Sequence, residues 1–122
     1  NAADLSVVKS LTGHTGTLNE VAFSASGEWL CVASGETGLA GQATLWKTSD
    51  WSRGRVFDGH RDAVYAVQLS PDGSKLATAS YDRDLKTWDV ASGQLLKTFS
   101  GHNDAIYGLS FSPNGRFLAT AS

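Results

Sequence analysis

A histidine, an aspartate and two hydroxyl side chains lie close together near the middle of the chain: His60, Asp82, and either Thr78 or Ser80. In serine hydrolases an aspartate orients a histidine, and the histidine removes the proton from a hydroxyl nucleophile. These residue types would suit that relay. A nucleophile also needs an exposed position and an oxyanion hole, and no stretch here resembles the strained Gly-x-Ser-x-Gly turn of hydrolases. The chain is therefore predicted not to be an enzyme.

The same residues belong to a segment that occurs three times. The copy from Gly59 to Ser80, GHRDAVYAVQLSPDGSKLATAS, aligns without gaps with residues 13–34 and 101–122. A tryptophan stands 13 residues before the second and the third copy, as Trp46 and Trp88. The step between copies is 46 residues and then 42, and the four additional residues fall within Gly35–Thr44. The chain is therefore built from an internal repeat.

Each copy predicts a series of short antiparallel strands. Residues 64–70 predict a strand, Ser70-Pro71-Asp72-Gly73 predicts a tight turn, and residues 75–80 predict the returning strand. Residues 84–90 and 94–99 predict a third and a fourth strand. The segment that precedes each Gly-His pair, residues 4–11 included, is predicted to be an outer strand. No segment has the period of a helix.

A repeat of about 40–45 residues that opens with Gly-His and closes with Trp-Asp resembles the WD-repeat family along the whole chain. The resemblance implies an all-β fold, a β-propeller of four-stranded antiparallel blades. The expected parts are an outer strand at 4–11, blades at 13–57 and 59–99, and a partial blade at 101–122. Because such propellers close with about four to eight blades, the propeller is incomplete in this chain. A fragment of a longer propeller is expected, and the total blade number stays open.

The resemblance gives the central polar residues a structural role instead of a catalytic one. It implies a buried hydrogen-bond network that joins the loop His60, the turn Asp82 and the strand residue Trp88. Thr78 is assigned by position as the hydroxyl member, with Ser80 as its neighbour on the same face. Such a network satisfies groups that cost ~1–3 kcal/mol each when buried without a partner.

The first copy departs from this pattern. Val32 stands at the position of Thr78, the turn that carries Asp82 is replaced by the insertion, and Trp46 is followed by Lys47. The network around His14 is therefore expected to be weaker. Three glycines among the ten residues of Gly35–Thr44 predict a flexible surface loop, whose role stays open.

Composition excludes several classes of function. The formal net charge is −2 and no basic stripe is apparent, so no nucleic-acid partner is predicted. No apolar run is long enough to span a membrane. The three histidines fall one per copy and no second ligand type lies at short spacing, so no metal or other cofactor is predicted. The single cysteine, Cys31, is predicted to pack in a strand, and the absence of a visible secretion signal favours the cytoplasm.

Surface recognition remains as the predicted activity. In the resembling family partners often dock on the loops before the first strand and between the second and third strands. The matching positions here are Asn19, Tyr65 and Tyr107 after the Gly-His loops, and Tyr81 beside Asp82. Tyrosines are enriched at binding hot spots. The alternative is that these tyrosines pack against a neighbouring blade.

The predicted function is a non-catalytic scaffold or platform for protein–protein interaction. Its partners would be other proteins or peptides, and the rest of the propeller or other copies of the chain would be needed to complete the ring. Two alternatives stay open. The chain could be an accessory propeller domain of a larger enzyme, or a structural unit that assembles through its unfinished blade.

Overall fold

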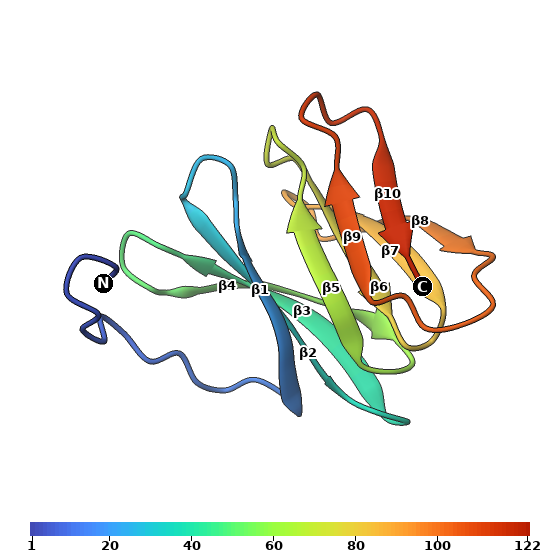
Figure 1. Ribbon diagram of the computed structural model, residues 1–122, viewed down its shortest axis with the longest axis horizontal. Coiled ribbons are helices and arrows are strands. Elements are labelled where there is room, and N and C mark those ends of the chain that lie inside the picture. The colour runs from blue at the N-terminus through green and yellow to red at the C-terminus, as the bar shows by residue number, and fades with distance from the viewer.

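The computed structural model describes residues 1–122, which form ten strands and no helix. The first sheet contains β1 (Thr17–Phe23), β2 (Trp29–Glu36), β3 (Ala40–Lys47) and β4 (Arg53–His60). The second contains β5 (Val64–Leu69), β6 (Lys75–Ser80), β7 (Asp84–Asp89) and β8 (Leu95–Ser100). A third sheet has two strands, β9 (Gly108–Phe111) and β10 (Leu118–Ala121). All pairings are antiparallel, and the sheets follow one another without closing into a ring (Figure 1). The predicted all-β class is confirmed.

Three strands of the second sheet, β5, β6 and β7, are buried on both faces because they alternate apolar residues toward two neighbours, whereas β8 is exposed. One face contributes Val67, Leu76 and Trp88 to a core shared with the first sheet. The other face contributes small residues, Ala66, Ala77 and Ala79, to a core shared with the loop and strands of the third sheet. The first and third sheets each have only one such neighbour. The second sheet therefore holds the three sheets together.

Side chains of one sheet also accept hydrogen bonds from backbone N–H groups on the first strand of the next sheet, here called its inner strand. The carboxylate of Glu20 on β1 accepts a hydrogen bond from the backbone N–H of Val67 on β5, at 2.6 Å. The side-chain oxygen of Gln68 on β5 accepts one from the N–H of Phe111 on β9, also at 2.6 Å. These bonds pair backbone donors at strand edges where no further strand lies.

Residues 4–11 form no strand, so the prediction of an outer strand there is wrong. The corresponding segments β4 and β8 each pair with the third strand of their sheet. No strand stands beside residues 4–11, so their backbone groups have no ladder partner. The apolar side chains Leu5, Val7 and Val8 are consequently exposed.

The insertion is not a loop but an extension of a β-hairpin. β2 and β3 continue their pairing through Ser34 and Gln42, then Gly35 and Gly41, to Glu36 and Ala40. A tight turn closes the hairpin, in which the N–H of Leu39 donates to the carbonyl of Glu36 at 3.0 Å. The glycines that suggested flexibility serve a close contact instead.

The extended hairpin abuts the loop that leads into the second sheet. A Cβ atom at Gly41 would lie 2.1 Å from the carbonyl oxygen of Asp62 and 2.6 Å from the backbone nitrogen of Val64. At the hairpin tip the N–H of Gly38 donates to the carboxylate of Asp62 at 2.8 Å. The insertion therefore joins the first sheet to the second.

We predict that Gly41→Ala destabilises the fold by about 1–3 kcal/mol, because the new methyl group meets backbone atoms that cannot rotate away. Urea unfolding of the purified protein measures the loss. Gly101→Ala is the matched control, since a Cβ at Gly101 meets nothing within 4 Å. An equal loss in the two variants would contradict the close contact between the hairpin and the loop.

Candidate functional site

His60, Asp82, Thr78 and Trp88 form one connected hydrogen-bond network in the second sheet. The Nδ1 atom of His60 lies 3.0 Å from a carboxylate oxygen of Asp82, and its Nε2 lies 2.8 Å from the hydroxyl of Thr78. The indole N–H of Trp88 donates to the same hydroxyl at 2.9 Å. The network joins the end of β4, the strand β6, the turn before β7 and the strand β7.

Donor and acceptor roles in the network follow from the carboxylate. The carboxylate of Asp82 can only accept, so Nδ1 of His60 donates to it, and Nε2 of the same ring bonds to the Thr78 hydroxyl. Burial would raise the pKa of Asp82, but hydrogen bonds from His60 and the backbone N–H of Arg61 hold it well below the ordinary value. The Thr78 hydroxyl accepts from the indole N–H of Trp88 and also bonds to His60, so two bonds restrain it.

This order of aspartate, histidine and hydroxyl is the order of a hydrolase relay, but no substrate can reach it. The side chains of His60 and Asp82 are 1% and 4% exposed, and Thr78 is buried. Ser80 is buried too, and its hydroxyl donates to the backbone carbonyls of Asp62 and Ala63. The arrangement ties loop to strand and offers no accessible nucleophile.

The first sheet has lost the hydroxyl that connects the network. Val32 occupies the position of Thr78 and is buried. The indole nitrogen of Trp46 and the Nδ1 of His14 are both buried without a hydrogen-bond partner, and the two rings lie 5.5 Å apart. Burial and the nearby charge of Arg53 lower the pKa of His14.

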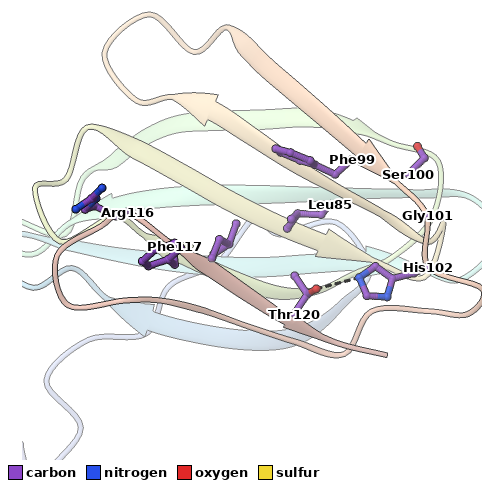
Figure 2. A pocket seen from close by; sticks show the side chains of 9 residues that line it. Leu85, Phe99, Ser100, Gly101, His102, Arg116, Phe117 and Thr120 are labelled. Carbon is purple, nitrogen blue, oxygen red and sulfur yellow. Dashed lines mark hydrogen bonds between the residues drawn. The ribbon is translucent and has the colours of Figure 1, made fainter.

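The third repeat also contains a histidine and hydroxyl side chains that bond to one another. His102 Nε2 lies 2.9 Å from the hydroxyl of Thr120, and its Nδ1 lies 3.0 Å from that of Ser122. Beside this pair a groove of about 510 Å³ opens between the second and third sheets (Figure 2). Phe99 and Phe117 are part of its lining.

The lining of this groove repeats the surroundings of Trp88. In the second sheet Trp88 bonds to Thr78, pairs with Leu76 across the strands and lies edge-on to Phe57. Each lining residue Phe99, Gly101, His102, Leu118 and Thr120 stands 42 residues after its counterpart around Trp88, respectively Phe57, Gly59, His60, Leu76 and Thr78. The groove therefore has the lining of an indole site.

Tyr65, Tyr81 and Tyr107 lie together at the end of the molecule that carries the Gly-His loops. The ring of Tyr65 lies 5.3 Å from that of Tyr107 and 6.0 Å from that of Tyr81. Tyr81 is 42% exposed and Tyr107 is 58% exposed. The three residues, here called the tyrosine cluster, pack on one another and still present ring surface to solvent.

Asn19 is a predicted contact residue together with the tyrosines, but its side chain bonds to the protein backbone. Its side-chain amide donates to the backbone carbonyl of Val64 at 2.9 Å, which joins β1 to the start of β5. Asn19 and Tyr65 both sit where the strand pairing shifts, between Leu18 and Glu20 and between Val64 and Ala66. A bulge re-aims the side chain that it contains. The tyrosine is thereby free to contact neighbouring rings.

Three further features would point to another function: a reactive thiol, a metal site and a membrane-spanning helix. Burial, with a contribution from Glu20, raises the pKa of the Cys31 thiol to about 12, so it is a poor nucleophile. No three His, Cys, Asp or Glu side chains come together as a metal site would require. No helix capable of crossing a membrane is present.

Sequence reasoning did not single out Asp62 and Asp104. Both precede a buried alanine and stand at equivalent positions, two residues after His60 and His102. Their recurrence in the repeat was the available signal. Their orientation depends on backbone bonds that only the structure shows.

Comparison with known families accounts for this architecture. The model described as "WD domain, G-beta repeat" matches residues 5–47, 51–89 and 93–122. The chain belongs to the WD40 repeat family. The sheets of this WD40 chain are consistent with blades of an open, incomplete propeller.

Curated relatives are WD-repeat proteins of larger size. The WD40 chain is 32% identical over 90 residues to "Periodic tryptophan protein 2" of Saccharomyces cerevisiae, covering 74% of this chain and 9% of the relative. It is 32% identical over 88 residues to "Eukaryotic translation initiation factor 3 subunit I" of Aspergillus oryzae, covering 71% and 25%. It is 35% identical over 90 residues to "Nuclear distribution protein nudF" of Aspergillus flavus, covering 73% and 19%. The aligned part of the chain thus spans a quarter or less of each relative.

We predict opposite effects for a pair of reciprocal substitutions. Val32→Thr supplies the acceptor that Trp46 lacks and should stabilise the WD40 chain by about 0.5–1.5 kcal/mol. Thr78→Val removes the partner of both His60 and Trp88 and should destabilise it by about 1–3 kcal/mol. Chemical unfolding measures both. A loss of stability in Val32→Thr would argue against the missing hydroxyl as the defect in the first network.

Proposed function

We propose that this WD40 chain is part of a non-catalytic platform for protein–protein interaction, within a propeller longer than the chain itself. The binding surface is the end that carries the Gly-His loops, with Tyr65, Tyr81 and Tyr107 as contact residues. The observation that carries the proposal is the tyrosine cluster, in which Tyr81 and Tyr107 are 42% and 58% exposed.

The contrast between buried and exposed groups supports this assignment. The polar groups that could perform acid–base chemistry bond to one another in the interior. The aromatic groups at the same end remain accessible, and aromatic rings with a hydroxyl combine contact area with hydrogen bonding. Accessible aromatics favour recognition, whereas enclosed polar groups favour a structural role. Asn19 contributes to the framework beneath this surface.

The test compares the proteins that copurify with the wild type and with a Tyr81→Ser, Tyr107→Ser variant, by quantitative mass spectrometry. We expect partners of the wild type to be lost from the variant, with the unfolding free energy changed by no more than about 0.5 kcal/mol. Leu95→Ser, which alters an exposed apolar residue on β8, is the control. Retention of every partner by the double variant would refute the proposed surface.

The groove beside Thr120 supports a second part of the proposal, that a further strand completes the third blade. β10 has a free edge, because it pairs only with β9. A tryptophan-bearing strand would pair with this edge and place an indole N–H on the Thr120 hydroxyl, as Trp88 does on Thr78. The rest of a longer propeller or another copy of the chain could supply that strand.

A labelled peptide with the sequence of residues 83–92, RDLKTWDVAS, tests this completion in the 122-residue chain by fluorescence anisotropy. We expect saturable binding that weakens about tenfold, or ~1.4 kcal/mol, when the peptide's tryptophan is replaced by leucine. Thr120→Val should weaken the original peptide and leave the leucine peptide unaffected. Equal binding of both peptides would show that the groove does not select an indole.

A further inference from the structure

The tyrosine cluster adjoins a depression whose chemistry defines a class of ligand. An open depression of about 450 Å³ lies between Arg61–Asp62, Tyr81–Arg83 and Asn103–Asp104. Tyr81 belongs to both the cluster and the depression. The aromatic surface and this polar surface are therefore continuous.

Charge at this end of the molecule is predominantly negative. Its loops and strand ends carry six carboxylates, whereas four basic side chains lie at this end: Glu36, Asp58, Asp62, Asp82, Asp84 and Asp104 against Arg53, Arg61, Arg83 and Lys86. Two of the basic groups face Asp84, with the guanidinium of Arg61 and the ammonium of Lys86 each 3.7 Å from its carboxylate. Arg83 makes no ion pair, and the excess remains negative. A cation is attracted to this end, whereas a phosphate-rich ligand is repelled.

Two of these carboxylates are held in place with one oxygen unused. Oδ1 of Asp62 accepts hydrogen bonds from the N–H groups of Gly38 and Ala63, both at 2.8 Å. Oδ1 of Asp104 accepts one from the N–H of Ala105 at 2.7 Å. Neither Oδ2 has a hydrogen-bond partner. Each aspartate therefore offers an oriented acceptor, and the inserted hairpin fixes that of Asp62.

The negative charge of Asp104 also acts on Tyr107 of the tyrosine cluster. Partial burial and the charge of Asp104 raise the pKa of the Tyr107 hydroxyl. The faces of tyrosine rings are electron-rich and attract ammonium and guanidinium groups within about 6 Å of the ring centre. Rings and carboxylates thus favour the same ligand charge.

We propose that this surface binds a lysine or arginine side chain of a basic peptide segment, with the cation in the depression over the exposed ring of Tyr81. The carboxylates of Asp62 and Asp104 supply the opposite charge. The inference rests on the proposed function, since it names the partner chemistry of the same surface. The proposed function requires only that a partner contacts the tyrosine rings, whereas the inference also requires that the partner presents a cation.

Fluorine NMR can follow this site selectively. The chain contains three tyrosines, and all three belong to the cluster, so incorporation of 3-fluorotyrosine labels nothing else. The probes are the N-acetyl, N-methylamide derivatives of lysine and arginine, with the norleucine derivative as the uncharged match for lysine. We expect saturable shifts of the fluorine resonances with the two cationic probes, weakened by added salt. Norleucine should give little shift.

Matched variants separate charge from structure. Asp62→Asn with Asp104→Asn keeps the backbone-facing oxygens and removes two charges, so we expect lysine-probe binding to weaken about threefold or more. Glu28→Gln removes a carboxylate in the turn between β1 and β2 and should leave binding unchanged. Urea unfolding of both free variants, with midpoints unchanged from the wild type, verifies that the fold is intact.

Three outcomes would overturn the inference: equal responses to lysine and norleucine, undiminished lysine binding in the double variant, or a stronger response to an anionic probe, the N-acetyl, N-methylamide derivative of glutamate. The last would assign the site to Arg61 and Arg83 and an anionic ligand. These failures leave the proposed function standing if protein partners are still lost from the Tyr81→Ser, Tyr107→Ser variant. Retention of partners by that variant, with saturable lysine-probe binding to the wild type, would instead refute the proposed function alone.

Discussion

The structure depends on the covering of two apolar sheet faces at once. A four-stranded sheet whose strands point apolar residues to both sides loses that burial on any face without a neighbour, and each buried large side chain contributes about 1.5–3 kcal/mol. The second sheet meets this condition with large residues toward the first sheet and alanines toward the third. Backbone approach is consequently close on both sides. Polar groups in this interior must find partners within the protein.

The hydrogen-bond network that pairs these polar groups can be compared across the three repeats. The second has every member, and Thr78 connects His60 to Trp88. The first retains its histidine and tryptophan but has Val32 as the connecting residue, and its indole nitrogen is left without a partner. The third retains the histidine and the hydroxyl and has an open groove where an indole would lie. The connecting hydroxyl can thus be replaced, at the cost of an unpaired indole nitrogen.

Most of the fold could be predicted from the repeat, because strand, turn and Gly-His signals recur in register. The strand predicted at residues 4–11 failed because a strand needs a partner, and partners are not visible in a local pattern. The insertion was misjudged for a related reason. Gly35 and Gly41 suggested flexibility, but their small size admits the backbone of Asp62 to Val64. The tyrosine positions could be predicted from the repeat. The orientation of Asp62 and the hydrogen bond of Asn19 to Val64 depend on contacts between blades, which the repeat does not reveal.

The bonds from Glu20 and Gln68 to the inner strands bear on aggregation. An edge strand with free N–H groups is a template for another chain, and repeat proteins with similar segments are prone to such mispairing. Here side chains of the neighbouring sheet occupy donors on β5 and β9. An incoming strand would have to displace a carboxylate or an amide before it could add to the inner edge. A polar residue on one blade thereby acts as a gatekeeper against fibril-like addition to the next.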